Sequence, residues 1–257
     1  DGINMQDNTT KIIDNVSYRN YFTIDSRITY KKLIVINEQS LKLVYELQLS
    51  YDSLYYLHES NKLLDKSYED KLSIDTYITR NHYSIQDCIK QANCVHIPRG
   101  VETKKIDTII KKNDLQNIER NYYRLCYTNA YETGLLPIIQ HLYPELKRLQ
   151  PTIELHLYGA IREGTNPQLT QMLQRYIPQE GIVDHGICDF ETIIREKHTS
   201  GFHVNFIDNS KTDSVAVKES IYCECMPIIS NKDCFKELVG IHFDLHTGEV
   251  ESYKKIA

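Results

Sequence analysis

The stretch Lys211–Ser214 comes directly before a predicted helix, and its residue types suit phosphate binding. The first turn of a helix exposes backbone N–H groups and a partial positive charge, both of which favour an anion. Lys211 and Arg162 would add full positive charges. The alternative is simple capping, because Thr212, Asp213 and Ser214 all belong to the residue types that cap helices. The residue types alone favour neither interpretation over the other.

Glu219 lies on the same predicted helix, one to two turns from its start. A carboxylate there can accept hydrogen bonds from the hydroxyl groups of a ligand held at the helix start. Taken alone, a solvated surface glutamate is the commoner interpretation. Cys223 and Cys225 have no further cysteine or histidine cluster nearby in sequence, so they indicate small buried residues rather than a metal site.

These residues must be positioned by the elements around them, and short apolar runs alternate with longer amphipathic stretches along most of the chain. That alternation is typical of βαβ units with parallel strands. In the first part it predicts strands at 32–36, 53–57, 76–79 and 94–97, a weaker strand at 21–24, and helices at 38–48, 59–65 and 84–91. The lysine-rich stretch 102–119 reads as a connection with some helix.

The second part has a clearer pattern, in which six predicted strands have helices between most of them. The strands lie at 124–128, 154–158, 182–184, 202–207, 227–230 and 241–243, and the helices at 135–149, 169–176, 190–197 and 214–223. Such an order predicts a doubly wound sheet.

Ligands of an open α/β sheet bind beyond the carboxyl ends of its strands. This rule selects the loops 127–134, 159–164 and 208–214 as candidate binding loops. Gly134 and Gly159 end elements there, where glycine permits a positive φ or a close backbone approach. A plain turn is the alternative for each glycine.

The composition excludes some functions. A net charge of −5 with only short basic runs argues against a nucleic-acid partner. No apolar run reaches the ~20 residues that cross a bilayer, and no signal peptide is visible. The seven scattered cysteines favour reduced thiols and a cytoplasmic location.

Four segments of the chain resemble GT-B glycosyltransferases, especially the family 4 group. The most specific is 211–230, "KTDSVAVKESIYCECMPIIS", which is similar to that family's loop, helix, small-residue turn and proline-started strand without a gap. The others are 95–102, 127–134 with the later strand 151–159, and 183–186. The resemblance covers roughly residues 94–257.

The resemblance implies a donor site for a nucleotide diphosphate sugar, linked to UDP, GDP or dTDP. Backbone groups at Asp213, Ser214 and Val215 would hold the diphosphate, and Glu219 would accept from the ribose hydroxyls. The base would lie near His185 and Gly186. The remaining donor-binding candidates are Asn129, Thr133, Gly134 and Thr212.

Two departures from the family's pattern put activity in question. Lys211 stands where the family usually has a glutamate that contacts the transferred sugar, and Thr133 stands where it favours Arg or Lys. Lys211 or Arg162 would then offset the charge of the departing diphosphate. With His58, which follows a strand of the first part, they are the candidate catalytic residues. A helix-start histidine is the commoner interpretation of His58.

The expected fold is therefore α/β and GT-B-like, with two Rossmann-like domains facing a cleft. The predicted boundaries are a short acceptor-side domain at 1–100, a linker at 101–123 and a donor-binding domain at 124–257. The expected activity is transfer to a glycan, lipid or protein acceptor with retention, without a metal or other cofactor. The alternative is an impaired sugar-nucleotide-binding or scaffold module of the same fold. A Rossmann dehydrogenase is disfavoured, since no G-x-G-x-x-G follows a predicted strand.

Overall fold

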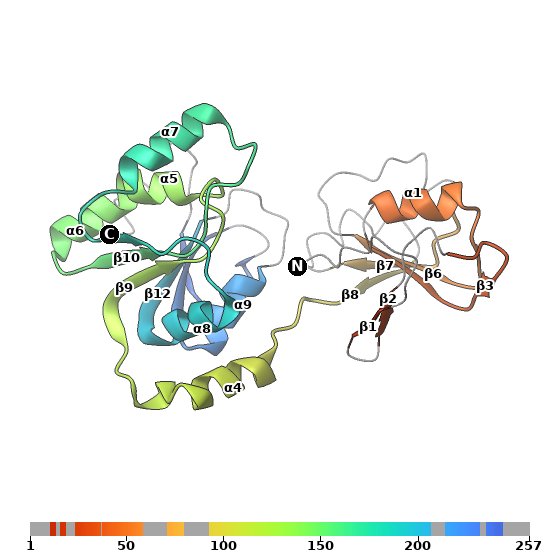
Figure 1. Ribbon diagram of the computed structural model, residues 1–257, viewed down its shortest axis with the longest axis horizontal. Coiled ribbons are helices and arrows are strands. Elements are labelled where there is room, and N and C mark those ends of the chain that lie inside the picture. The colour runs from red at the N-terminus through yellow and green to blue at the C-terminus, as the bar shows by residue number, and fades with distance from the viewer. Residues whose placement is uncertain are drawn as a thin grey trace. The chain divides into compact units, whose positions relative to one another are not determined.

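The computed structural model describes residues 11–13, 16–18, 24–36, 38–58, 71–79, 93–206, 214–231 and 235–243. These residues form two compact units that divide between Ile97 and Pro98 (Figure 1). The predicted helices at 59–65 and 84–91, and most of the predicted strand at 21–24, lie outside the described residues.

Unit 1 contains a four-stranded parallel sheet in the order β4-β6-β7-β8. Its strands are β4 Leu33–Ile36, β6 Leu54–His58, β7 Thr76–Thr79 and β8 Cys94–His96. Smaller pairs are the parallel β3 Thr29–Tyr30 with β5 Ser50–Tyr51 and the antiparallel β1 Lys11–Ile13 with β2 Val16–Tyr18. Helix α1, Glu38–Glu46, packs Leu41 and Val44 into one core with Val35, Tyr56 and Tyr77.

Unit 2 contains a six-stranded parallel sheet in the order β11-β10-β9-β12-β13-β14. The strands are β9 Asn121–Tyr127, β10 Glu154–Leu157, β11 Ile182–Asp184, β12 Ser200–Asn205, β13 Met226–Ser230 and β14 Ile241–Phe243. The chain winds outward from β9 to β11 and then returns to β12 on the other side of β9. This is the doubly wound order that the sequence predicted, with its switch point between β9 and β12.

Helices cover both faces of this sheet (Figure 1). One face carries α5 Leu135–Pro137, α6 Tyr143–Leu149 and α7 Pro167–Tyr176, and the other carries α4 Thr103–Lys112, α8 Phe190–Thr199 and α9 Val215–Tyr222. The main core lies on the first face, where Leu125 and Leu155 of the strands belong to one buried cluster with Leu135 and Leu173 of the helices.

The predicted helix at 135–149 is interrupted by a π-helical segment, η3 Ile138–Leu142, between α5 and α6. Pro144 has no N–H, so the carbonyl of Gln140 cannot receive the usual bond from four residues ahead. The wider π-type turn therefore lies directly before the proline.

The stretch 101–123, predicted as a linker, contains α4, the short helix η2 Leu115–Asn117 and the start of β9. Ile106 and Ile109 of α4 pack against Ile194 of α8 and Cys223. Further along, the Arg120 guanidinium donates to the carbonyls of Ser200 at 2.7 Å and Cys223 at 2.9 Å. This stretch is thus part of unit 2 in its packing.

Candidate functional site

Three loops meet at the carboxyl edge of the unit 2 sheet, where β9, β10 and β11 end. The Gly159 N–H donates to the carbonyl of Gly186 at 2.8 Å, and the Tyr131 N–H donates to the carbonyl of Ala160 at 3.2 Å. The Tyr131 hydroxyl also donates to the Asp184 carboxylate. The loops that the sequence selected after β9 and β10 are therefore joined to the loop after β11 by direct hydrogen bonds.

Gly134 fits closely against the end of β12. Its φ is +114°, and a Cβ at this position would lie 1.8 Å from the carbonyl oxygen of Phe206. Only glycine satisfies both conditions, so Gly134 has both the positive φ and the close backbone approach that were the two alternatives to a plain turn. Thr133, just before it, donates its hydroxyl to the carbonyl of Ala130 at 2.6 Å, so it serves the turn.

Two polar side chains of these loops remain candidates for ligand contact. The Asn129 side-chain Nδ2 is buried and has no hydrogen-bond partner among the described residues. Arg162 lies in the loop after β10 with a side chain 72% exposed, and its guanidinium forms an ion pair with Glu132 at 3.3 Å. The Glu132 side chain is 17% exposed, so this pair is half-buried, and its exposed guanidinium end remains accessible to a phosphate.

Helix α9 starts at the same edge and is capped by Ser214. The Ser214 Oγ accepts from the N–H of Val217 at 3.4 Å, and the Asn205 side chain donates to the same oxygen at 3.4 Å. Val215 is the first helical residue. The described residues thus support capping for Ser214, whereas Lys211, Thr212 and Asp213 lie outside them.

Glu219 is not a solvated surface residue. Its side chain is only 15% exposed, and its Oε2 accepts from the Nζ of Lys197 at 2.8 Å. Lys197 is fully buried in α8, and its Nζ also donates to the carbonyl of Ala216 at 2.8 Å. The commoner interpretation of Glu219 is therefore wrong, because its carboxylate is the ion-pair partner of a buried ammonium.

A second buried contact links α9 to the loop after β9. The His203 Nε2 lies 3.1 Å from the Thr128 hydroxyl, and its Nδ1 lies 2.8 Å from the Ser220 hydroxyl. Because the Ser220 hydroxyl donates to the carbonyl of Ala216, it accepts from Nδ1–H, and Nε2 accepts from Thr128. Complete burial, together with the nearby Lys197 charge, holds the pKa of His203 well below its usual value, so the ring is neutral.

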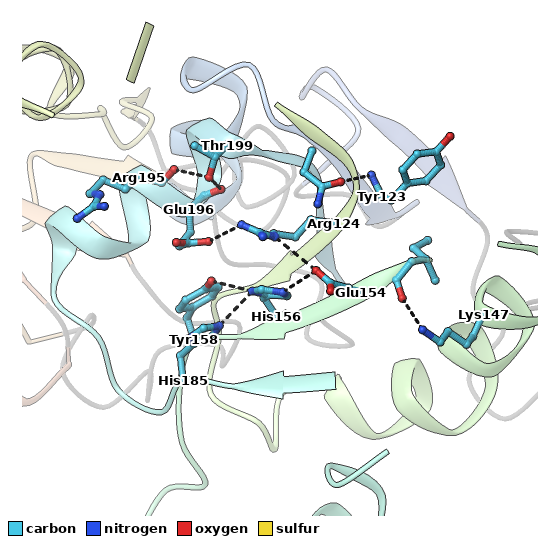
Figure 2. Close-up of polar contacts among 12 residues, drawn as sticks. Tyr123, Arg124, Lys147, Glu154, His156, Tyr158, His185, Arg195, Glu196 and Thr199 are labelled. Carbon is cyan, nitrogen blue, oxygen red and sulfur yellow. Dashed lines mark hydrogen bonds and ion pairs between the residues drawn. The ribbon is translucent and has the colours of Figure 1, made fainter. Parts of the chain in front are cut away.

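His185 follows β11 and lies exposed at the edge, next to an aromatic and polar network (Figure 2). Its ring stacks on that of Tyr158 with centroids 4.6 Å apart and planes 5° from parallel. Its Nε2 lies 3.1 Å from the Nδ1 of His156, whose own Nε2 lies 3.2 Å from Glu154. Burial lowers the pKa of His156, and the nearby Arg124 adds to this effect.

Gly186, predicted near the base with His185, has a φ of +68° and donates its N–H to the Asp184 carboxylate at 2.9 Å. His58 ends β6 in unit 1, and its side chain lies outside the described residues. Cys223 and Cys225 are buried at the end of α9, as predicted. No group of three or more potential metal ligands occurs within the described ranges.

Sequence reasoning missed Lys197, His203, His156 and Tyr158. Lys197 had a detectable signal, because Phe190, Ile194 and Lys197 follow the spacing of an inward helix face, where a lysine needs a buried partner. His203 lies on β12 and His156 on β10, and Tyr158 follows β10 directly, so their partners depend on how the strands pair.

The described helices contain none that is long and apolar enough to cross a membrane. No protein-family model matches the chain, and neither does any curated protein.

Solved structures, by contrast, are similar in fold. HepE from Anabaena in complex with UDP-glucose matches at 12% identity, with a TM-score of 0.61 over 87% of this chain and 67% of that one. A sucrose-phosphate synthase from Thermosynechococcus elongatus matches at 13% identity, with a TM-score of 0.62 over 88% and 63%. A UDP-forming trehalose-phosphate synthase from Burkholderia vietnamiensis matches at 9% identity, with a TM-score of 0.61 over 86% and 64%.

These neighbours are GT-B glycosyltransferases, and the chain has their fold, with a parallel α/β sheet in each of its two units. At such low identity the likeness concerns the fold alone. The chain spans 48% to 67% of the length of these and similar solved structures.

Proposed function

We propose that the protein is a glycosyltransferase that moves a sugar from a nucleotide diphosphate sugar to an acceptor hydroxyl, with retention of anomeric configuration. The observation that carries this proposal is the paired Glu219 on a helix that starts at the carboxyl edge of a GT-B sheet. The solved HepE structures, which hold UDP and UDP-glucose, support a UDP-linked donor.

The donor diphosphate would lie against the amino end of α9, where free N–H groups and the helix dipole favour negative charge. Glu219 points back toward that end, because side chains on a helix tilt toward its N-terminus. Its carboxylate is then placed to accept from the ribose hydroxyls. The oxygen that Lys197 does not use remains for the ligand.

Catalysis in this scheme comes from position and charge. Arg162 and Lys211 would stabilise the diphosphate as it leaves, and alignment with the acceptor hydroxyl would lower the entropic part of the barrier. This scheme requires no metal ion, and the scattered cysteines favour a cytoplasmic setting. A glycan, lipid or protein would supply the acceptor hydroxyl.

A second candidate is a sugar-nucleotide-binding module without transfer activity. Two observations favour it. Thr133, at the position where the family favours Arg or Lys, donates its hydroxyl to the carbonyl of Ala130, and Arg162 is already paired with Glu132. A bound donor would then meet less positive charge at its leaving group.

Calorimetry with UDP-, GDP- and dTDP-linked sugars tests binding, and donor-hydrolysis and transfer assays test turnover. The proposal expects binding and turnover, both sharply reduced in Glu219→Gln. Glu180→Gln is the matched control, since Glu180 is exposed and lies before the opposite end of β11. Binding without hydrolysis or transfer would favour the module, and no binding to any of the three donors would refute both candidates.

A further inference from the structure

A hollow of about 550 Å³ lies in unit 1, where α1 ends beside the strand pair β3 and β5 (Figure 1). We call it the α1 hollow. Its described lining is apolar at Val44, Leu49 and Leu72, aromatic at Tyr45 and Tyr51, and polar at Thr29, Glu46, Gln48 and Ser50. Cavities of this size hold small ligands or parts of larger ones.

The α1 hollow is separate from the transfer site of the proposed function. Strands β3 and β5 precede β4 and β6 in the chain, so the hollow lies at the amino end of the unit 1 sheet. The transfer site belongs instead to the carboxyl edge, where ligands of such sheets bind.

Helix α1 ends in a Schellman motif, and Gln48 occupies the left-handed position of that motif. The Leu49 N–H donates to the carbonyl of Val44 at 3.2 Å, and the Gln48 N–H donates to that of Tyr45 at 3.1 Å. Gln48 has a φ of +51°, and Leu49 and Val44 belong to one buried cluster. Glycine is the usual residue at this position, because a Cβ is strained in the left-handed conformation.

The strain at Gln48 points to a use for its side chain. A residue held in a costly backbone conformation at a cavity is a reason to suspect a functional role. Glycine would relieve the strain but would remove an amide from the wall of the α1 hollow. That amide both donates and accepts hydrogen bonds, and the adjacent Glu46 carboxylate accepts them. Both groups suit a ligand with hydroxyl groups.

The rest of the lining narrows the class of ligand. Glu46 is the only charged residue among the described ones that line the α1 hollow, so an anionic ligand would meet repulsion and no cation. A wholly apolar ligand would leave the four polar side chains of the lining covered without partners. A neutral ligand with hydroxyl groups avoids both costs.

An aromatic ring completes this set of groups. Tyr45 is 39% exposed, and the Lys71 ammonium lies 5.0 Å from its ring centroid, which helps to hold the ring in place. A sugar ring has apolar C–H faces that can pack on an aromatic side chain and hydroxyl groups at its edges. The lining therefore matches a sugar on both counts.

We propose that the α1 hollow binds a neutral glycan, which is the part of the acceptor that lies away from the reacting hydroxyl. Tyr45 packs on a sugar ring, and Gln48 and Glu46 hydrogen-bond its hydroxyl groups. The acceptor role rests on the proposed function. An acceptor that also reaches the carboxyl edge must span β6, which has five residues and is about 17 Å long. The acceptor is therefore an extended sugar chain, and binding its remote part helps to align the reacting end.

An array of neutral and acidic oligosaccharides, probed with the protein in the absence of nucleotide, tests the class of ligand. We expect binding to neutral oligosaccharides, weakened about tenfold in Gln48→Gly and in Tyr45→Ala. Asp114→Gly is the matched control, since it also replaces a residue at a φ of +51° but lies in unit 2, and it should bind as the unchanged protein does. Binding confined to acidic glycans, or to none, would overturn the inference.

Urea unfolding of two Gln48 variants separates binding from stability. Gln48→Gly should unfold at a higher urea concentration than the unchanged protein, whereas Gln48→Ala should not, because alanine keeps the strained Cβ. Both variants should lose glycan binding equally, so the loss cannot come from unfolding. A glycine variant that still binds glycans, or that is no more stable than the alanine variant, would contradict the role given to Gln48.

Calorimetry with UDP-glucose keeps this inference apart from the proposed function. The Gln48 variants should bind UDP-glucose as the unchanged protein does, because the α1 hollow lies at the other end of its sheet. If the protein turns over a nucleotide sugar but binds no neutral glycan, the inference alone fails. If it binds neutral glycans through Gln48 but no nucleotide sugar, the proposed function fails and only the acceptor role falls with it.

Discussion

The substitution Lys197→Met removes the ammonium that pairs with Glu219 and keeps most of the side-chain volume. Lys197 is 0% exposed and Glu219 15% exposed, so the Glu219 carboxylate would lose its 2.8 Å partner in a place where little water can replace it. Removing one partner of a buried pair typically costs 3–5 kcal/mol. Because Glu219 keeps some solvent contact, we expect the lower end, about 3 kcal/mol in the free energy of unfolding.

Urea unfolding followed by circular dichroism measures this loss, with two companion variants. Lys112→Met breaks the exposed ion pair with Glu191, in which the Lys112 side chain is 66% exposed and the Glu191 side chain 36% exposed, and should cost far less than Lys197→Met. The double variant Lys197→Met with Glu219→Leu removes both charges and should recover at least half of the loss, because no unpaired ion remains.

The same variants separate structure from binding. Lys197→Met should weaken the binding of UDP more than the binding of 2′,3′-dideoxy-UDP, because only UDP has the ribose hydroxyl groups from which Glu219 would accept hydrogen bonds. A loss in Lys197→Met no larger than that in Lys112→Met would refute the reasoning, since it would mean that the Lys197 and Glu219 charges are solvated or independent.

Three further outcomes follow from the geometry. Gly134→Ala should destabilise unit 2 by more than ~3 kcal/mol in urea unfolding, since the new Cβ would overlap the carbonyl oxygen of Phe206. Gly164→Ala, at a φ of +81° but with open space around it, should cost about 1–2 kcal/mol. Equal losses in the two variants would contradict the role of the Phe206 contact. The lowered pKa of His203 stabilises the fold fully above the unfolded-state pKa of ~6.5, and this stabilisation is lost as pH falls below that value, by up to ~1.4 kcal/mol per pH unit. In His203→Asn the slope of unfolding free energy against pH should fall by the equivalent of about one proton. An unchanged slope would exclude a neutral buried ring. Arg162→Gln keeps a side-chain donor opposite Glu132 and should weaken UDP-glucose binding in calorimetry, and unaltered affinity would remove this arginine from the site.

The elements of unit 2 were predictable because their apolar periodicity is strong and their boundaries carry clear signals. β11 and β14 have the predicted bounds, whereas β9 starts three residues earlier than predicted, at Asn121. That early start was hidden because Tyr122 and Tyr123 are exposed and break the apolar pattern. The π-helical turn before Pro144 was also missed, since a proline inside an apolar pattern does not say how the helix adapts.

The candidate site was predictable as a set of loops but not as a set of contacts. The rule on strand ends places residues such as Gly134 and His185 at one edge of the sheet. It says nothing of His156, whose neighbours are set by the register with Cys126 on β9 and Val183 on β11. It also says nothing of Lys197 and Glu219, which meet only because α8 and α9 pack side by side.

Arg120 has a practical consequence for dividing the chain. Its guanidinium holds three carbonyls, those of Lys197, Ser200 and Cys223, at the far end of the sheet from the candidate site. A fragment that begins near residue 124, where the sequence predicts the first strand of unit 2, lacks Arg120 and α4. Those three oxygens would then lose their donor, and α8 would lose the helix that packs on it. An independently expressed half should therefore begin at Pro98, where the compact unit itself begins.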